Sequence, residues 1–488
     1  MENYRMFING AFCEAAGKET LDSFQPWSGE AWARIPRGQA ADANAAVEAA
    51  HAALSGPWGA LSPSARGALL RRLADLLAGE AQYLAEIEVR DNGKILAEMR
   101  AQMAYLPEVY YYFAGLADKV EGTAPPIGRP GYFAYTRLEP VGVVAAITPW
   151  NSPLLLAASK IAPALAAGCT VVHKPSEFSS ASALEFARIV EAAGFPAGVF
   201  NVVTGYGAEV GDALVHHPKV ARISFTGGSQ AGKAINQIAA ARLIRCDLEL
   251  GGKSPNIVFD DADLDMAANG VISGIFAASG QSCLAGSRLL VQDSIHDAFV
   301  ERLLNIARQA VVGNPLDEGT QIGPVTTEQQ FAKVLDYIRI AKEGGATCVL
   351  GGERIDRPGW FVQPTIFTDV TNDMRIAREE VFGPVLSVIR FKDEGDALRI
   401  ANDCNFGLAA GIWTRDLGKA FRMSERLEAG TVWVNSYRML SCQMPFGGYK
   451  ESGTGRENGL EAIRANLEVK SVFLNHSAVV GNPFIMKL

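Results

Sequence analysis

Apolar residues in the first quarter of the chain recur at helical spacing. Residues 40–56, 62–91 and 97–120 carry alanine or leucine every three or four positions, with charged residues between them. Ser64 and the triplet Asp91-Asn92-Gly93 are typical of a helix start and a helix stop. The pattern therefore predicts three helices before residue 120.

A proline- and glycine-rich break at residues 124–131 separates these helices from a different pattern. Residues 133–138 are rich in aromatic and β-branched side chains, which predicts a short strand. From Val141 onward, short apolar runs alternate with longer helical segments. This alternation is typical of a parallel, doubly wound α/β sheet, which binds its ligand at the carboxyl ends of the strands.

Two such α/β blocks follow one another, with the second beginning near Lys253. Strands are predicted at residues 141–147, 170–173, 199–203, 222–225, 257–259, 289–291, 385–391, 409–413 and 431–435. Helices are predicted between them at residues 154–167, 181–193, 267–279 and 295–309. A chain of 488 residues is long enough for about three units of ordinary domain size.

Composition and charge narrow the functional class. The chain is 48% apolar and 20% charged, as in ordinary globular proteins. Its net charge of −8 argues against a nucleic-acid partner, which needs a basic surface. The longest apolar region, residues 154–172, contains Lys160 and Pro163, so no membrane span is expected. The first residues also lack the pattern of a secretory signal.

The cysteines are seven in number and widely scattered. They form no CxxC pair and no cluster with histidine, so neither a disulfide framework nor a metal site is expected. A reducing compartment is the simplest location for such a chain. We therefore expect a cytoplasmic protein.

Three side chains stand out as candidates for chemistry. Cys283 lies between glycines just after a predicted helix and can present its sulfur, although most free cysteines are small buried apolar residues. Glu249 is flanked by leucines, and burial would raise its pKa toward that of a working base; the alternative is a solvated strand end. Asn151 lies between prolines after a buried strand and can donate to an oxyanion, or can be an ordinary turn asparagine.

Two glycine-rich loops are candidates for phosphate binding. Residues 205–211 follow a strand but lack the GxGxxG spacing, whereas residues 225–232 follow a strand and open a helix. Glu177 follows another strand, where an acidic side chain can hold ribose hydroxyls. Each signal is weak alone.

In their joint order these segments resemble the NAD(P)-dependent aldehyde dehydrogenase superfamily. The most specific matches are Leu248-Glu249-Leu250-Gly251-Gly252-Lys253 and Gly280-Gln281-Ser282-Cys283, whose Glu and Cys are 283 − 249 = 34 residues apart. Further matches are Glu380-Val381-Phe382-Gly383-Pro384 and Pro445-Phe446-Gly447-Gly448-Tyr449-Lys450. The resemblance extends from Phe7 to about Val472.

The resemblance implies a catalytic role for each of the three candidates. Cys283 would be the nucleophile, Glu249 the general base, and Asn151 would form an oxyanion hole with the backbone N–H of Cys283. The sulfur would attack the aldehyde to give a thiohemiacetal, and loss of hydride would leave a thioester. Water activated by Glu249 would then release the carboxylic acid.

The resemblance also implies NAD as the cofactor. NADP is possible but less favoured, because Glu177 would repel a 2′-phosphate. Position 228 is glycine where many relatives have serine, so one phosphate contact would be absent. The implied cofactor residues are Thr148, Pro149, Trp150, Lys174, Glu177, Gly207, Phe225, Gly228, Ser229, Leu250, Glu380 and Phe382.

The substrate tunnel implied by the resemblance is wide and polar, since Ser152 and Ser159 stand where relatives often have aromatic rings. Arg438 would bind a substrate carboxylate, or it would pair with an acidic residue of the protein or of a neighbouring subunit. We therefore expect a medium-sized polar or aromatic aldehyde, or a semialdehyde with an acid group. The implied tunnel residues are Ser152, Leu156, Ser159, Ser282, Leu284, Arg438, Leu440 and Phe446.

A three-part organisation is implied as well. Residues 1–119 and 139–252 would form the NAD-binding domain, residues 253–451 the catalytic domain, and residues 120–138 and 467–488 a small oligomerisation element. A homodimer or homotetramer is expected.

Two alternatives remain beside this reading. A CoA-acylating relative would resolve the thioester with CoA, but such enzymes generally lack the glutamate found here at position 249. A non-catalytic binding or structural protein of the same fold has no support, because Cys283, Glu249 and Asn151 are all present.

Overall fold

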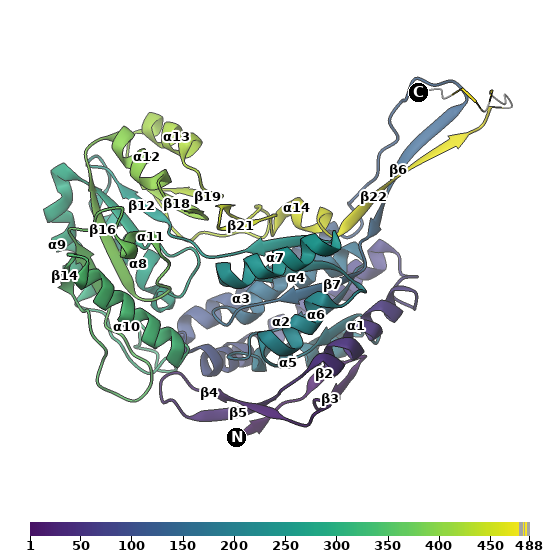
Figure 1. The fold of residues 1–488 in the computed structure, drawn as a ribbon, viewed down its shortest axis with the longest axis horizontal. Helices are drawn as coiled ribbons and strands as arrows, with labels where there is room; N and C mark the ends of the chain where they lie inside the picture. The colour runs from purple at the N-terminus through teal and green to yellow at the C-terminus, as the bar shows by residue number, and fades with distance from the viewer. Residues whose placement is uncertain (478–481, 483, 486–488) are drawn as a thin grey trace.

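Two sheets flanked by helices form the body of the molecule, and a two-stranded sheet projects from it (Figure 1). The computed structural model describes residues 1–477, 482, 484 and 485. The chain has the predicted α/β class.

The first sheet has eight strands in the order β21-β11-β10-β7-β8-β9-β2-β3. Its five central strands are parallel, and the outer strands pair antiparallel. The bounds are β2 (Met6–Ile8), β3 (Ala11–Cys13), β7 (Val143–Ile147), β8 (Thr170–Lys174), β9 (Phe200–Val202), β10 (Val220–Thr226), β11 (Arg245–Glu249) and β21 (Gly453–Thr454).

Helices cover both faces of this sheet, as expected of a doubly wound fold (Figure 1). Val144 and Ala146 of β7 join the core made by α2 to α5, whereas Val143 and Ala145 face the core that includes α1 and α6. The bounds are α1 (Ala40–Leu54), α2 (Pro63–Asn92), α3 (Leu96–Leu116), α4 (Pro153–Ala167), α5 (Ala181–Ala193), α6 (Asp212–His216) and α7 (Ser229–Arg242).

The ends of the N-terminal helices differ slightly from the prediction. The start at Ser64 is wrong: Ser62 caps α2, and its hydroxyl accepts a hydrogen bond from the Ala65 N–H at 3.2 Å. The predicted stop is confirmed, because Gly93 ends α2 with a φ of 75°. Helix α3 ends at Leu116, four residues before the predicted boundary at residue 120.

Short strands before residue 40 were not predicted. A separate sheet contains β1 (Glu2–Asn3), β4 (Thr20–Phe24) and β5 (Ala31–Pro36), in the order β1-β5-β4. Strands β2 and β3 form a hairpin through Asn9 and Gly10, which both have positive φ, as a tight Asn-Gly turn requires. These strands have two to six residues, too few for a period-2 pattern to stand out.

The second sheet has seven strands in the order β14-β15-β16-β13-β12-β18-β19, all parallel except β14. Strands β14 and β15 and helices α10, α12 and α13 were not predicted. The strands are β12 (Pro255–Val258), β13 (Arg288–Gln292), β14 (Thr347–Leu350), β15 (Thr365–Thr368), β16 (Val385–Phe391), β18 (Ala409–Trp413) and β19 (Thr431–Val434). The helices are α8 (Leu264–Phe276), α9 (His296–Ala307), α10 (Glu328–Glu343), α11 (Arg375–Arg378), α12 (Glu394–Asn402) and α13 (Leu417–Arg426).

After the second sheet the chain returns to the first. Strand β20 (Tyr449–Lys450) pairs with β17 (Phe406–Gly407), β21 then pairs with β11, and α14 (Gly459–Arg464) follows. Strand β22 (Leu467–Asn475) pairs antiparallel with β6 (Tyr132–Pro140) along their full length. These two strands form the projecting sheet.

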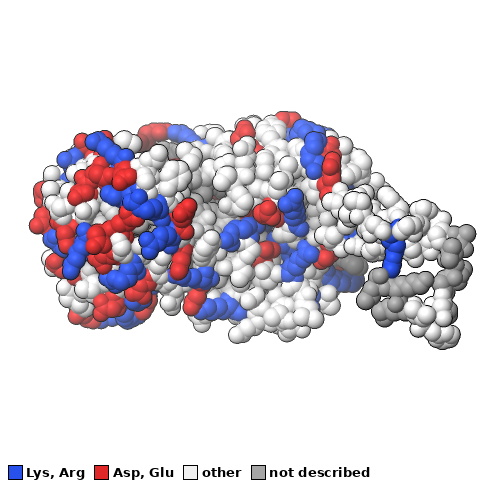
Figure 2. Space-filling model, turned by 90° about the horizontal axis from the view of Figure 1, so that it is seen from above, with Lys and Arg blue, Asp and Glu red and all other residues white. Residues whose placement is uncertain are grey.

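The surface changes character along the molecule. Lysine, arginine and acidic side chains are dense over the end that contains the second sheet, and they are sparser toward the projecting sheet (Figure 2). On that sheet Phe133, Val469 and Phe473 are more than half exposed, at 51%, 64% and 62%. Large apolar side chains are therefore open to contact there.

A buried carboxylate connects α2 to the first turn of α4. Glu88 Oε1 accepts hydrogen bonds from the Leu154 N–H at 2.8 Å and from the Ser182 hydroxyl at 3.2 Å. Burial raises the pKa of Glu88 to about 7. The contact fixes the start of α4, directly after the segment that carries Asn151.

We predict that Glu88→Leu destabilises the protein more than Glu88→Gln does. The glutamine keeps an acceptor for the Leu154 N–H, whereas leucine leaves this buried donor unpaired, at a cost of about 1–3 kcal/mol. Urea denaturation of both variants and the wild type measures the difference. Equal stability of the two variants would contradict the capping role of the Glu88 oxygen.

Candidate active site

The carboxyl ends of four adjacent parallel strands bring the predicted cofactor residues to one edge of the first sheet. Thr148 follows β7, Lys174 ends β8, residue 207 follows β9 and Phe225 lies near the end of β10. Parallel strands end at the same edge, so segments far apart in the sequence meet there. This is the position of the crevice predicted for the ligand.

A cavity of about 170 Å³ opens at this edge. It contains six predicted cofactor residues, namely Pro149, Trp150, Gly228, Leu250, Glu380 and Phe382, together with Asn151, Leu156, Glu249 and Cys283. The rings of Trp150 and Phe382 meet edge to face with centroids 5.3 Å apart. The structure also places Thr226, Gly227, Gly251, Gln330 and Lys333 in its wall, and these residues were not predicted.

The other predicted cofactor residues lie outside the wall of this cavity. Thr148 is buried, and its hydroxyl is 2.9 Å from His173 Nε2. The buried Lys174 ammonium donates to Glu177 at 3.3 Å and to the Pro175 carbonyl at 2.9 Å. Ser229 begins α7, while Gly207 begins a single turn of π-helix, residues 207–211.

The N-terminus of α7 offers space for an anion. Gly228 caps this helix, and a Cβ built on Gly228 would have no atom within 4 Å. Helix N-termini present free N–H groups and a positive dipole end. The absence of a side chain at position 228 therefore leaves room for a phosphate beside those groups.

The segment that precedes Cys283 has an unusual backbone. Ala278, Ser279 and Gly280 have φ values of 55°, 52° and 70°, all in the left-handed region. Gly280 also lies so close to the second sheet's loop that a Cβ would be 2.0 Å from the Gly383 carbonyl oxygen. Backbone strain of this kind persists only where the surroundings hold it, and it is typical of functional sites.

Buried side chains hold this segment in place. The Ser279 hydroxyl donates to the Gly323 carbonyl at 2.8 Å. Gln281 is fully buried, and its Oε1 accepts from the Thr326 N–H at 2.9 Å. Asn151 donates from its side-chain amide to the Gln281 carbonyl at 3.0 Å, which links the β7 loop to the Cys283 loop.

Glu249 and Cys283 share the cavity but differ in surroundings. Glu249 ends β11 at 3% exposure, and neither carboxylate oxygen has a hydrogen-bond partner among the described residues. Burial, and then the neighbouring Glu457, raises the pKa of Glu249 well above its usual range. Burial, and then Glu380, raises the pKa of the Cys283 thiol to about 12.

The paired glycines after Glu249 allow Glu380 to approach the backbone. Glu380 Oε1 accepts from the Gly252 N–H at 3.0 Å. A Cβ at position 251 would lie 2.3 Å from Glu380 Oε2, so any side chain there would displace this carboxylate. Glycine at positions 251 and 252 thus allows the Glu380 carboxylate to contact the backbone directly.

A second cavity of about 360 Å³ reaches Cys283 as well. All eight predicted substrate residues line it, namely Ser152, Leu156, Ser159, Ser282, Leu284, Arg438, Leu440 and Phe446. The first cavity is called the cofactor cavity below, and this second one the substrate cavity, after the predicted residues that line each. The two cavities share Asn151, Leu156 and Cys283. The sulfur therefore borders both cavities.

The predicted polar residues of the second cavity have partners within the protein. Arg438 Nη2 is 3.3 Å from Glu98 Oε1, which corresponds to the alternative of an acidic partner in the protein. The Ser152 hydroxyl accepts from Lys94 at 2.8 Å, and the Ser159 hydroxyl is 2.6 Å from Glu457.

Several charged residues of this cavity were missed by the sequence analysis. Lys94 follows the predicted stop at residues 91–93, and Glu98 lies at the start of the helix predicted over residues 97–120, where its charge carried no signal of a site. Glu457 follows the 445–450 motif without any signal of its own, and its carboxylate pairs with the buried Lys160. Only the packing of α3 and α4 against the C-terminal loop brings these charges together.

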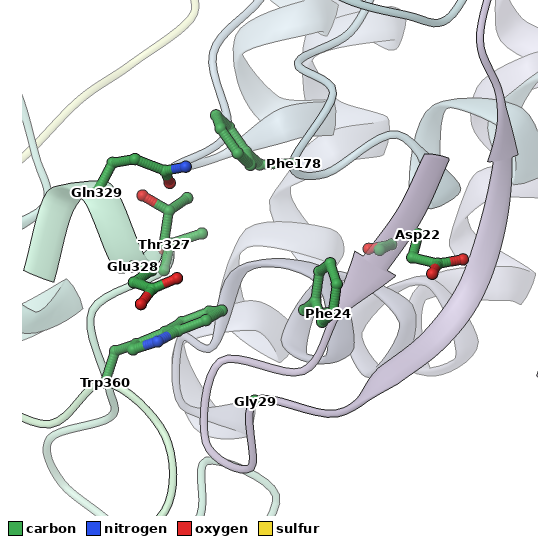
Figure 3. A pocket seen from close by; sticks show the side chains of 10 residues that line it. Asp22, Phe24, Gly29, Phe178, Thr327, Glu328, Gln329 and Trp360 are labelled. Atoms are coloured by element: carbon green, nitrogen blue, oxygen red, sulfur yellow. The ribbon is translucent and has the colours of Figure 1, made fainter. Parts of the chain in front are cut away.

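A third hollow of about 320 Å³ shares no lining residue with the first two cavities. Figure 3 shows it from close by. Phe24, Phe178 and Trp360 surround it, together with Glu328 from the start of α10. Its wall contains no cysteine, histidine or lysine. It has no residue of the predicted site, although Phe178 directly follows Glu177.

A comparison with known families decides the assignment. The family described as "Aldehyde dehydrogenase family" matches residues 12–472 of the chain. The chain belongs to this family. The predicted family and fold class are thus confirmed.

Individual relatives of this aldehyde dehydrogenase family member cover nearly its whole length or all of it. A protein of Acinetobacter baylyi named (Z)-2-((N-methylformamido)methylene)-5-hydroxybutyrolactone dehydrogenase is 46% identical, with 100% of both chains covered. The mitochondrial aldehyde dehydrogenase of Homo sapiens is 45% identical over 96% of this chain and 91% of its own. A betaine aldehyde dehydrogenase from Staphylococcus aureus, solved with NAD+, matches with a TM-score of 0.97 and 42% identity over 100% of both chains.

Two further observations concern the described residues only. No group of three or more histidine, cysteine, aspartate or glutamate side chains is placed to hold a metal ion. Among the same residues, no helix has the length and apolar character that crossing a membrane requires.

We predict that alkylation of Cys283 by iodoacetamide rises about tenfold per pH unit from about pH 7 to about pH 10. The thiolate is the reactive form, and a thiol with a pKa of about 12 gains thiolate throughout this range. Mass spectrometry of the peptide that contains Cys283 measures the rate, and Cys283→Ser provides the control. A rate that levels off near pH 8.5 would show an unperturbed thiol instead.

Proposed function

We propose that this protein oxidises an aldehyde to a carboxylic acid with NAD. The observation that carries the proposal is the position of the Cys283 sulfur, which borders two cavities and shares their junction with Asn151. Family membership supports the same reaction class.

The residues at this edge of the first sheet, inside and beside the cavity, suit NAD. The open N-terminus of α7 at Gly228 would hold the pyrophosphate, and Lys174 with Glu177 would hold the adenosine ribose. Glu380, Trp150 and Phe382 would surround the nicotinamide end. When bound, NAD supplies the hydride acceptor and a positive charge beside the sulfur.

The chain's own groups then account for the covalent steps. Cys283 attacks the aldehyde carbon, and the resulting oxyanion accepts hydrogen bonds from the Asn151 amide and the Cys283 backbone N–H. After hydride loss the acyl group remains on sulfur as a thioester.

Glu249 is suited to the hydrolysis of that thioester. Its buried carboxylate lacks hydrogen-bond partners among the described residues, so a water molecule can bond to it directly. The raised pKa makes Glu249 a stronger base than an exposed glutamate. A glutamate in this position favours water over CoA as the acyl acceptor.

We predict that Cys283→Ser lowers aldehyde oxidation by at least about 10⁴-fold while NAD binding persists, as for other removed nucleophiles. Glu249→Gln should release one burst of NADH per active site and then stall, because the thioester cannot be hydrolysed. Stopped-flow absorbance measures NADH formation by both variants. A Glu249→Gln enzyme with no burst would place Glu249 in the activation of Cys283, and normal turnover would remove it from the mechanism.

We also predict a preference for NAD over NADP that depends on Glu177. The carboxylate repels a 2′-phosphate, so kcat/KM should be higher for NAD, and Glu177→Ser should narrow the difference. Steady-state kinetics with both cofactors measures this. Equal kcat/KM values in the wild type would contradict the role of Glu177, since Lys174 would then be neutralising the phosphate.

The substrate cavity favours a medium-sized polar aldehyde. Its volume of about 360 Å³ and its serine, lysine, arginine and glutamate side chains suit a substrate with oxygen acceptors better than a small apolar one. An aromatic aldehyde or a semialdehyde falls within the same class. The relative from Acinetobacter baylyi acts, by its name, on an oxygen-rich lactone.

The same proposal includes a homodimer or homotetramer built through the projecting sheet. Strands β6 and β22 form an isolated two-stranded sheet, which is marginally stable alone, and it exposes Phe133, Val469 and Phe473. Residues 120–138 and 467–488 would be the oligomerisation element, of which residues 478–481, 483 and 486–488 lie outside the described part.

The remaining parts of the proposal concern organisation and location. Residues 1–119 and 139–252 would bind NAD, and residues 253–451, which carry Cys283, would form the catalytic domain. A cytoplasmic location is supported by the scattered free cysteines.

A further inference from the structure

Three charged side chains form a cluster on the α3 side of the substrate cavity. Lys94 precedes α3, Glu98 lies in its first turn, and Arg438 comes from the loop after β19. The Glu98 Oε1 atom is 3.6 Å from the Lys94 ammonium and 3.3 Å from Arg438 Nη2. One carboxylate therefore serves two cations, and the cluster has a net charge of +1.

The two cations differ in how completely they are satisfied. Arg438 also donates to the Ser273 carbonyl at 3.3 Å, so two protein oxygens hold its guanidinium. The Lys94 side chain is 3% exposed and donates to the Ser152 hydroxyl at 2.8 Å, while Glu98 lies beyond hydrogen-bond distance. An ammonium has three N–H donors, so Lys94 retains donors for a ligand in the cavity.

The other ionisable groups that line the cavity do not cancel this charge. The Glu457 carboxylate pairs with the buried Lys160 ammonium and the Ser159 hydroxyl. The Tyr105 oxygen accepts from the Cys442 N–H. The Glu88 carboxylate also attracts the Lys94 ammonium, but Glu88 does not line the cavity, and its Oε1 accepts from the Leu154 N–H and the Ser182 hydroxyl. Within the cavity wall, the positive charge therefore remains with the Lys94 cluster.

The aromatic content of the cavity argues against a cationic substrate. Quaternary ammonium groups are recognised by cages of several aromatic rings. Here Tyr105 and Phe446 are the aromatic lining residues, and they share the wall with Lys94 and Arg438. A positive substrate group would meet two positive side chains and no complete cage.

We propose that Lys94 is a specificity-determining residue that binds a carboxylate at the far end of the substrate from its aldehyde. The inference rests on the proposed aldehyde oxidation and moves acid recognition from Arg438 to Lys94. Arg438 positions Glu98, and Glu98 limits the positive charge that the substrate meets. Lys94 lies farther from Glu98 than Arg438 does, at 3.6 Å against 3.3 Å, and makes no hydrogen bond to it, so Lys94 gains more from a substrate carboxylate.

The test compares three aldehydes of equal chain length that end in a carboxylate, its methyl ester or a trimethylammonium group. The wild type should have the highest kcat/KM for the acid. Lys94→Met should lower kcat/KM for the acid by about tenfold or more, mainly through KM, because a hydrogen bond to a charged group is lost. The ester should change less than about twofold, as neutral contacts remain.

Two matched variants sharpen the comparison. Glu98→Gln removes the negative charge, so it should raise the ratio of acid to ester, opposite in sign to Lys94→Met. Ser441→Ala changes an uncharged wall residue of the same cavity and should leave this ratio unaltered. Lys94→Arg keeps the charge and should retain the preference for the acid, which separates charge from folding.

Specific results would overturn the inference. Equal losses of kcat/KM for the acid and the ester in Lys94→Met would contradict carboxylate binding by Lys94. Lys94 would then affect the reaction by positioning Ser152 and the neighbouring Asn151, or by its charge near the Cys283 thiol. A wild type with a higher kcat/KM for the ester or the trimethylammonium aldehyde than for the acid would also refute the role of Lys94. The proposed function would remain intact in that case, because NADH would still be formed. If none of the aldehydes yields NADH, the proposed function itself is refuted.

Discussion

The hydrogen bond from the Asn151 amide to the Gln281 carbonyl connects the two halves of the site. Asn151 lies two residues before α4, and Gln281 belongs to a loop that hydrogen bonds to Gly323 and Thr326 hold in place. This contact places the Cys283 sulfur where the cofactor cavity meets the substrate cavity. The hydrogen bond thus links the proposed nucleophile loop to the proposed oxyanion donor across 130 residues of sequence.

Backbone strain before Cys283 and burial of Glu249 and Cys283 both occur around this contact. Three left-handed residues before Cys283 are tolerated because Ser279 and Gln281 are bonded on the far side of the loop. Burial leaves Glu249 without partners and raises the pKa values of Glu249 and Cys283. Both shifts have burial as their largest cause, so the two groups depend on the same enclosure by the two sheets.

The substrate cavity shows a different balance of forces. Its polar residues are arranged in pairs and clusters, because buried charges need partners. The sequence left two partners open for Arg438, a substrate carboxylate or an acidic residue of the protein, and the structure pairs it with Glu98. Lys94 retains N–H donors for a ligand. What the cavity can bind therefore depends on which of the two cations, Lys94 or Arg438, the Glu98 carboxylate approaches more closely.

The sequence alone determined the α/β class and most of the long helices before residue 310, because buried parallel strands and helical periodicity leave local signals. The family resemblance, carried by the joint order of several short motifs, indicated the candidate reactive residues. It missed the strands before residue 40 and the pairs β14–β15 and β6–β22 in their full length, since short or edge strands carry weak periodicity. Only the tertiary structure decided the partners of Arg438, Ser152 and Ser159. Lys94 and Glu98 are four residues apart on one helix start, but Arg438 lies 340 residues from Glu98 and Glu457 lies 297 residues from Lys160, so no local spacing encodes those two contacts.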